Sequence, residues 1–415
     1  MKFTVLLLAM LLISCNPTVS KQEGVDEGKK IYVGNLPFSA IAESISVVVT
    51  PEGVNVAVHS KAQSADKNKI KDIIQLALAP SDGSKSQIQT ILESSKGEDV
   101  PQIAGFVSGN KPVLLLSKGS ELSFIIGSAI DKLKTSVLKK DEGGRHTPFR
   151  NRFAALSYQN DGTYIVSSQM VGPNPNNELD AIQEFIKVSS DGKVLSSQEV
   201  SVNPIKWNNE NASDGFVSRS KIYVADGVIA SAFQTPGEEA SLVRLMQGQN
   251  SSELIVKGYP LDVWTDGKNV RTATKQSDCI AAIYENQDPV YKQQTVLGSC
   301  TAIKFLKNGD AYVVNVAPDD DKGITINTTH VEYSTNKMKN GTVKFKGQYI
   351  SCKSDIDVDA DGLIHLVYSG PDDDCDKRLK LAGTDVCDLD QDGKADLALH
   401  HVKIGRATSE LQSQR

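Results

Sequence analysis

The sequence contains few of the motifs from which catalytic sites are commonly built. It has no Gly-x-Ser-x-Gly elbow, no phosphate-binding P-loop and no Gly-x-Gly-x-x-Gly turn. Its six histidines form neither His-x-x-x-His nor His-Glu-x-x-His, and His400 and His401 point to opposite faces if they lie on a strand. These absences disfavour a motif-defined enzyme. A carboxylate pair for glycoside hydrolysis stays open, because 51 acidic residues allow many pairings.

Basic charge and long apolar segments are also scarce. The chain carries 45 basic and 51 acidic residues, for a net charge of −6, which argues against general nucleic-acid binding. The longest wholly apolar run, Val5 to Ile13, is too short to span a bilayer as a helix, and no second stretch of about 18 apolar residues follows. We therefore expect a soluble globular body behind an N-terminal processing signal.

The N-terminus ends its apolar run with Leu12-Ile13-Ser14-Cys15. This pattern resembles the lipobox of bacterial lipoproteins, which implies a signal peptide over residues 1–14 and a lipid-modified Cys15. Residues 15–30 then form a flexible tether, and the lipid is the protein's only contact with the membrane. Asn16 favours the outer membrane over the inner membrane, and the side of that membrane is left open. The alternative is an ordinary cleaved signal peptide with a chance cysteine.

Five further cysteines lie between residues 279 and 387. Export permits disulfides, and an odd number leaves at least one thiol unpaired. Cys279 and Cys300 flank a hairpin that turns at Asn286 to Pro289, so a bridge could join its ends. Cys375 could pair with either Cys352 or Cys387, and the sequence does not choose between them.

Hairpins recur along the whole chain. Most strand-like segments are joined at Asp-Gly or Asn-Gly pairs, which favour the tight turns of two-residue hairpins, and the first two units turn at Glu52-Gly53 and near Gly109-Asn110. A second, looser hairpin follows in most cases. The resulting units begin near residues 45, 103, 154, 218, 261, 302 and 354.

Seven units of about 40 to 65 residues, each with four strands, predict an all-β fold. We interpret it as a β-propeller of seven four-stranded blades over residues 31–405, with a C-terminal tail over 406–415. Six or eight blades stay open because the spacing is uneven. The alternative fold is two β-sandwiches joined near Gly143-Gly144-Arg145. Residues 128–140 are the only segment that looks helical.

One acidic loop has the spacing of a calcium site. Carboxylates recur at alternate positions around Gly393, and a curled loop of this kind supplies the oxygen ligands that Ca²⁺ prefers. Counted from Asp388 as position 1, position 12 of the loop is Leu399, where an EF-hand has a glutamate. The proposed ligands are Asp388, Asp390, Asp392, the carbonyl of Lys394, and Asp396.

The loop and its following Leu-Ala-Leu resemble the calcium loop of FG-GAP and VCBS-type repeats. The resemblance covers about 15 residues and implies structural calcium in an outer blade. A solvated Asp-Gly turn is the alternative. Asp357, Asp359 and Asp361 form a weaker second loop, because His365 stands at its ninth position and imidazole is a poor calcium ligand. These acids could instead line a channel, on the same face of a strand as Asp355.

Acidic residues also occupy the link between the two hairpins in the last two units. The residues are Asp319, Asp320, Asp321, Asp372, Asp373 and Asp374. In a propeller these links share the face opposite the Asp-Gly turns, so they are candidate interaction loops, or else simply solvated acids.

These observations favour a non-catalytic binding or assembly module that is anchored by lipid in the cell envelope and supported by calcium. Its expected partner is an envelope protein or glycan, and nucleic acid is not expected. An envelope polysaccharide hydrolase or lyase that uses carboxylates on the propeller face is the alternative. A structural lipoprotein bound to peptidoglycan or outer-membrane proteins is a third reading.

Overall fold

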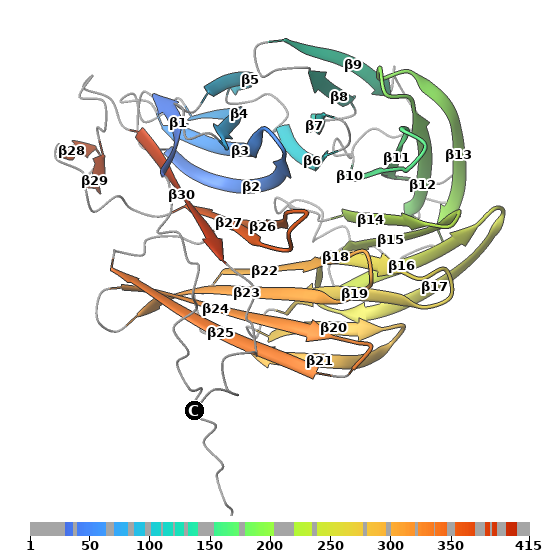
Figure 1. Cartoon of the computed structure of the whole chain (residues 1–415). Coiled ribbons are helices and arrows are strands. Elements are labelled where there is room, and N and C mark those ends of the chain that lie inside the picture. The colour runs from blue at the N-terminus through green and yellow to red at the C-terminus, as the bar shows by residue number, and fades with distance from the viewer. Residues whose placement is uncertain are drawn as a thin grey trace, which may run out of the picture.

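The computed structural model (Figure 1) describes residues 30–35, 40–63, 70–81, 87–95, 101–108, 111–118, 121–127, 132–139, 153–173, 179–202, 220–234, 239–276, 280–295, 300–319, 323–335, 337–346, 353–369, 378–381, 384–387 and 396–404. These residues form strands and turns without a helix, so none of them belongs to a helix that could cross a membrane.

The strands form seven four-stranded antiparallel sheets, the blades of a β-propeller. Each of the first six blades uses four consecutive strands, from the channel outward. Blade 1 contains β2 (Ala40–Thr50), β3 (Gly53–Gln63), β4 (Ile70–Pro80) and β5 (Gln87–Ser95). Blade 2 contains β6 (Pro101–Ser108), β7 (Pro112–Lys118), β8 (Glu121–Gly127) and β9 (Leu133–Lys139). Blade 3 contains β10 (Phe153–Tyr158), β11 (Tyr164–Pro173), β12 (Leu179–Val188) and β13 (Val194–Val202).

The next three blades repeat this order. Blade 4 contains β14 (Ser220–Ala225), β15 (Val228–Gln234), β16 (Ala240–Gln247) and β17 (Asn250–Lys257). Blade 5 contains β18 (Tyr259–Thr265), β19 (Val270–Lys275), β20 (Ile280–Glu285) and β21 (Asp288–Gln294). Blade 6 contains β22 (Cys300–Phe305), β23 (Ala311–Asp319), β24 (Gly323–Glu332) and β25 (Lys337–Lys346). The predicted unit starts therefore coincide with, or lie within a few residues of, the starts of the innermost strands.

Blade 7 departs from the predicted pair of consecutive hairpins. Its strand order is β26 (Ser354–Val358), β27 (Ile364–Ser369), β30 (Asp396–Ile404) and then β1 (Lys30–Asn35) from the N-terminus. Ile31 pairs with Leu399, and Asn35 pairs with Asp396. The chain between β27 and β30 includes the separate two-stranded sheet of β28 (Arg378–Leu381) and β29 (Thr384–Cys387). The two ends of the propeller thus meet in one blade.

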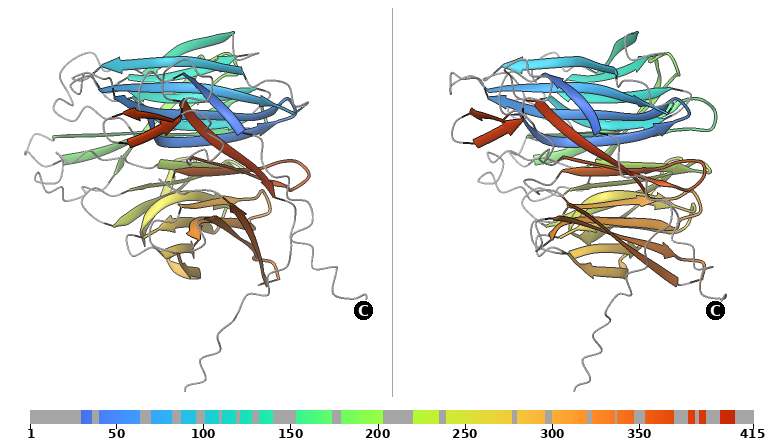
Figure 2. Two further views of the ribbon diagram at one scale, coloured as in Figure 1. Left: turned by 90° about the vertical axis from the view of Figure 1, so that its left-hand side faces the viewer. Right: turned by 60° about the vertical axis from the view of Figure 1, so that its left-hand side comes forward.

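The ring is continuous, and in Figure 2 blade 7 lies between blades 1 and 6. Innermost strand β26 contacts both β2 and β22. A hydrophobic cluster also joins blades 2 and 3, across the segment where two sandwiches would have separated. The two-sandwich alternative is therefore wrong. The helical expectation for residues 128–140 is also wrong where the segment is described, because β9 pairs with β8 as the outer strand of blade 2.

The geometry of the turns explains why glycine recurs after Asp or Asn in the hairpins of the sequence. Four hairpins end in loops with the same two backbone hydrogen bonds, over residues 159–163, 189–193, 306–310 and 359–363. In each loop the fourth residue is a glycine at positive φ, which makes three-residue loops with a glycine bulge. The expected two-residue turns at Asp161-Gly162, Asn308-Gly309 and Asp361-Gly362 are thus one residue longer. A two-residue turn does close β14 and β15, with Asp226 and Gly227 both at positive φ.

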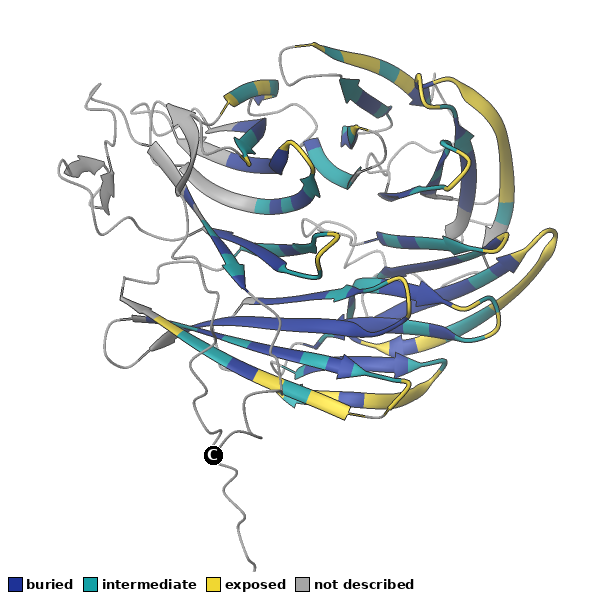
Figure 3. Cartoon of the chain, in the orientation of Figure 1, coloured by how far each residue is buried: buried dark blue, intermediate teal, exposed yellow. Residues whose placement is uncertain are grey.

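The core is distributed around the ring, since each of the seven seams between blades holds its own hydrophobic cluster. The inner strands are mostly buried, and the outer strands carry most of the exposed surface (Figure 3). The seam of blades 3 and 4 adds a polar network. Gln183 Nε2 donates to Ser167 Oγ (2.8 Å) and Ser231 Oγ (2.9 Å), and Gln183 Oε1 accepts from the fully buried Arg244 (3.0 Å).

Leu399 offers a test of the closing seam. It is fully buried in the cluster that joins blades 7 and 1. We expect Leu399→Ala to lower the free energy of unfolding by about 2–5 kcal/mol, because it leaves a cavity that the neighbouring strands cannot fill. The matched control is Leu195→Ala on outer strand β13, where Leu195 is 55% exposed. Denaturant unfolding curves check both, and equal losses would contradict a packed closing seam.

Candidate functional site

A cavity of about 1310 Å³ lies at the centre of the ring. It is lined by residues from the innermost strand of every blade, among them Val49, Phe106, Ser157, Lys221, Asp262, Lys304 and Asp357. Residues of three inner-hairpin turns also line it, including Asn160, Lys307 and Ala360. The cavity therefore opens on the face that carries these turns, which we call the turn face.

Aspartates of the innermost strands bind the backbone of the next blade. Asp355 Oδ2 accepts from Val47 N (2.9 Å) and Asp357 Oδ2 accepts from Val49 N (2.9 Å), so two carboxylates of β26 hold β2. Asp262 Oδ2 accepts from Phe305 N (2.8 Å) in the same way, from β18 to β22. An innermost strand has a free edge toward the channel, and a neighbouring carboxylate satisfies N–H groups there that no further strand can reach.

Lys304 supplies positive charge among these carboxylates. Its Nζ lies 3.7 Å from Asp357 Oδ1. Desolvation opposes its charge, but the carboxylates of Asp357, Asp262 and Asp355 outweigh that effect and raise the pKa of the ammonium group. The side chain still keeps 43% of its surface, because it faces the open centre of a channel walled by protein.

Desolvation also acts on the carboxylate of Asp355. Desolvation raises its pKa, although Lys221, the Val47 N–H and Lys304 all favour the ionised form. Of the acids that the sequence placed along one face of β26, Asp355 and Asp357 are therefore compensated by lysines of blades 4 and 6 and by backbone N–H groups.

A cluster around His330 lies at the wall of the cavity in blade 6. The ring stacks on Tyr312 at 4.5 Å, and its Nδ1 lies 3.6 Å from Glu332 Oε1. Glu332 also pairs with Lys339 Nζ at 2.6 Å. Asp310 Oδ2 lies 3.9 Å from His330 Nε2, while its Oδ1 accepts from Tyr333 N (3.0 Å).

A second histidine cluster leads from the cavity into blade 7. Asp359, which lines the cavity, has its Oδ2 3.0 Å from His365 Nε2, and His365 Nδ1 lies 3.1 Å from His401 Nε2. Desolvation opposes the charge of Asp359, but hydrogen bonds from His365 and from Leu363 N, with the nearby charges, hold its pKa below the ordinary value. Asp359 Oδ1 accepts from Asp361 N and Leu363 N.

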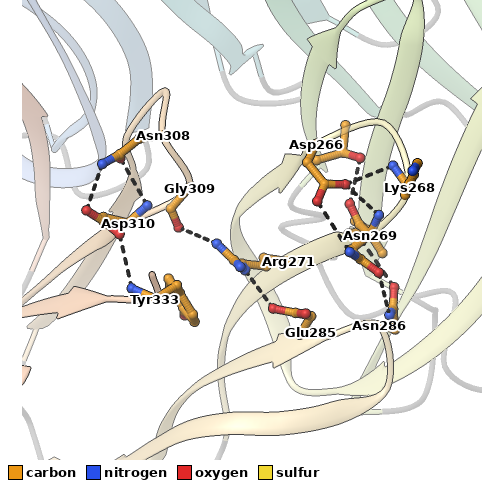
Figure 4. A network of polar contacts seen from close by, with 12 residues as sticks. Asp266, Lys268, Asn269, Arg271, Glu285, Asn286, Asn308, Gly309, Asp310 and Tyr333 are labelled. Atoms are coloured by element: carbon orange, nitrogen blue, oxygen red, sulfur yellow. Dashed lines mark hydrogen bonds and ion pairs between the residues drawn. The ribbon is translucent and has the colours of Figure 1, made fainter. Parts of the chain in front are cut away.

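A network on the turn face joins blades 5 and 6 (Figure 4). The guanidinium of Arg271 lies over Tyr333 (3.9 Å) and Trp264 (4.8 Å). Its Nε donates to Glu285 Oε2 (2.9 Å), and one terminal nitrogen donates to the carbonyl of Gly309 (3.0 Å). This network fixes the β22–β23 turn, which carries Lys307 and Asn308 at the mouth of the cavity.

Most of the predicted site residues lie outside the described part of the chain. These are Cys15, residues 388–395 of the calcium loop, residues 320–322 and 370–377 of the acidic links, and Cys279, Cys352 and Cys375. For Cys300, Cys387, Asp319 and Asp396 only the backbone is described. Within the described ranges, no three His, Cys, Asp or Glu side chains gather as a metal site. Both calcium loops stay predictions.

Sequence reasoning missed Lys221, Lys304, Asp262 and the His330 cluster. A signal for the first three was present, because each is a charged residue within a short apolar strand of a repeat unit, as in Ala-Ile-Lys-Phe and Leu-Asp-Val-Trp. The His330 cluster carried no such signal, since Asp310, Glu332 and Lys339 meet only through the pairing of β23, β24 and β25.

No protein-family model matches the chain, and no curated protein matches it. Solved structures similar to it include an apocarotenoid oxygenase of Synechocystis, at 10% identity and a TM-score of 0.46, which covers 82% of this chain and 89% of that one. The AfRom2 CNH domain has 9% identity and a TM-score of 0.43, with 92% and 100% covered. A neuraminidase-like protein of subtype N11 from a flat-faced bat isolate has 9% identity and a TM-score of 0.39, with 92% and 94% covered. Similarity at this level assigns no family and no activity.

Gly309 tests the network of Figure 4. A Cβ there would lie 2.6 Å from a guanidinium nitrogen of Arg271 and 2.8 Å from Trp264, at a φ of +85°. Gly162 has a similar φ of +82° in the equivalent loop of blade 3, with nothing within 4 Å. We expect Gly162→Ala to cost about 1–2 kcal/mol from backbone strain alone, and Gly309→Ala to cost clearly more. Equal shifts in denaturant unfolding would show that Arg271 and Trp264 do not constrain the turn.

Lys304→Met tests the charge balance of the channel. It leaves neighbouring carboxylates uncompensated, and we expect a loss of about 1–3 kcal/mol near neutral pH, between the values for exposed and buried pairs. Since the pKa of Lys304 is raised in the folded state, its contribution is complete below its ordinary value of 10.5 and is lost as the pH rises through the higher folded value. In unfolding curves measured from pH 7 to 12, the difference between the two proteins should therefore stay constant up to the ordinary pKa and shrink as the pH rises beyond it. Lys307→Met, at an exposed turn position, should show no such difference.

Proposed function

We propose that the protein is a non-catalytic binding or assembly module, that lipid on Cys15 anchors it in the bacterial cell envelope, and that its ligand enters the central cavity from the turn face. The observation that carries the binding function is the cavity of about 1310 Å³ with contributions from all seven blades. A rigid concave site with convergent polar groups is the usual form of a ligand site.

The hydrogen bonds that the aspartates around the cavity accept from the backbone favour a binding function over hydrolysis. Asp262, Asp355 and Asp357 each accept a backbone N–H of the adjacent blade, and Asp359 accepts from two backbone N–H groups and contacts His365. Carboxylates that hold the scaffold in this way cannot move protons freely without loosening a seam. Tyr158, Tyr223 and Tyr312 add aromatic surface beside the lysines, which suits a polar envelope protein segment or a glycan.

The lipid anchor and the calcium loop rest on the sequence. Lys30 begins β1, so a tether from Cys15 would lead directly into the closing strand. The calcium loop of residues 388–396 leads into β30, the partner of β1. Calcium bound there would stabilise the strand that closes the ring, which makes the proposed structural role physically reasonable.

One observation keeps a polysaccharide hydrolase or lyase as the second candidate. Asp310 and Glu332 both line the cavity, on either side of His330. Two carboxylates beside an open cavity are the minimum that such chemistry needs. Glu332 is paired with Lys339, whose ammonium group lowers its pKa, so Glu332 would serve as a base or nucleophile and not as an acid.

The experiment is affinity capture from solubilised envelopes with two charge-reversed proteins. Lys307→Glu changes the mouth of the cavity, whereas Lys268→Glu changes an exposed turn that does not line it. We expect the wild type and Lys268→Glu to capture the same partner, and Lys307→Glu to lose it by about tenfold or more. A parallel sample with a calcium chelator should lose capture if the calcium loop supports the ring.

Two results would contradict the proposal. Capture that is equal for both variants would remove the cavity mouth as the binding site. Release of reducing ends from purified envelope polysaccharide by the wild type, but not by Glu332→Gln, would establish the enzymatic reading instead.

A further inference from the structure

A smaller cavity of about 370 Å³ lies where blades 2 and 3 meet. Its lining comes from the ends and turns of β7 to β11 and from the β12–β13 turn, with Lys111, Lys132, Lys134, Tyr158, Tyr164 and Asp191 as the chemically significant residues. Tyr158 also lines the central cavity, so the two cavities are neighbours on the turn face.

The charge of this cavity is opposite to that of the whole chain. Three lysines line it with one carboxylate, in a protein of net charge −6. Among the described residues, Lys111 and Lys132 form no ion pair, and Lys134 Nζ donates to the backbone carbonyl of Asp191 (3.2 Å). Asp191 directs its carboxylate elsewhere, toward Ser189 Oγ (2.5 Å) and Lys193 Nζ (3.5 Å). The carboxylate of Asp191 therefore does not neutralise these three lysines, and their ammonium groups can bind an anionic ligand.

The cavity also has an aromatic side. The rings of Tyr158 and Tyr164 lie 5.2 Å apart, and Phe124 packs edge-on against Tyr164 at 5.2 Å. Tyr164 is 2% exposed, and desolvation raises the pKa of its phenol to about 12, so it stays neutral. Tyr158 is half-buried against these packed rings and is the aromatic side chain that remains accessible, and a volume of this size accommodates more than an inorganic ion.

We propose that this cavity binds an anionic sugar unit, with the acid group between the lysines and the sugar ring against Tyr158. Ammonium groups form charge-assisted hydrogen bonds with carboxylate and phosphate oxygens alike, so an acidic or a phosphorylated sugar would fit. Ser190 adds a hydroxyl for the ring. The proposal does not depend on what the central cavity binds.

The test is calorimetric titration of the whole protein at low ionic strength with four probes: glucuronate, glucose 6-phosphate, glucose and inorganic phosphate. We expect saturable binding of glucuronate or glucose 6-phosphate, and binding of glucose and of inorganic phosphate that is at least about tenfold weaker. Glucuronate and glucose 6-phosphate together also show which acid group the site prefers.

Variants locate the binding. Lys132→Gln with Lys134→Gln should weaken the preferred probe by about tenfold or more, because both side chains are exposed and their replacement leaves the fold intact. Lys268→Gln, on an exposed turn of blade 5, should stay within about twofold. Lys307→Glu at the central cavity should also bind the probe normally, which separates this proposal from the proposed function.

Three outcomes would overturn the proposal. The first is no saturable binding of either anionic sugar. The second is inorganic phosphate binding as tightly as glucose 6-phosphate, which would show that the ring contributes nothing. The third is equal weakening by Lys268→Gln and the double variant, which would reduce the effect to general electrostatic attraction.

Discussion

The fold depends on main-chain pairing between the two ends of the propeller. A blade must bury both faces against neighbours, so an open row of blades would expose apolar surface at each end. β1 prevents this by pairing with β30, while Ile45 and Val47 of blade 1 pack against Val367 and Leu399 of blade 7. The acceptor groups of Asp355 and Asp357 reinforce the same seam at the channel. The β1–β30 pairing, the hydrophobic cluster and the hydrogen bonds of the innermost strand β26 therefore all contribute to closing the ring at blade 7.

Much of the fold could be predicted from local sequence. Glycine after Asp or Asn marks the inner turn of five of the seven repeats, because few other residues adopt positive φ at low cost, and the spacing of the strand-like segments supplies the other two. The strand order of blade 7 could not be predicted from such local signals. Nothing local in Lys30 to Asn35 shows that it pairs with residues 396–400, more than 360 positions away. The segment 128–140 failed for a related reason, since β9 is an outer strand without the apolar alternation of a buried one.

The site was less predictable than the fold. The alternating acids of β26 and the following turn suggested a channel lining, and Asp357 and Asp359 do line the central cavity. The partners of Asp355 and Asp357 come from other blades, so spacing alone could not show that Lys304 pairs with Asp357 or that Val47 and Val49 donate to these two carboxylates. The basic lining of the smaller cavity was equally hidden, because Lys111 at the start of β7 meets Lys132 and Lys134 at the start of β9 only through the antiparallel pairing of blade 2.

The position of β1 has a mechanical consequence. Among the described strands, β1 is the first that traction on the chain ahead of Lys30 reaches, and it is the outermost strand of its blade. Pulled along its axis, β1 would share the load among all its bonds to β30, whereas pulled sideways it would peel away one bond at a time. The direction of approach to a supporting surface would therefore set how much force the closed molecule withstands.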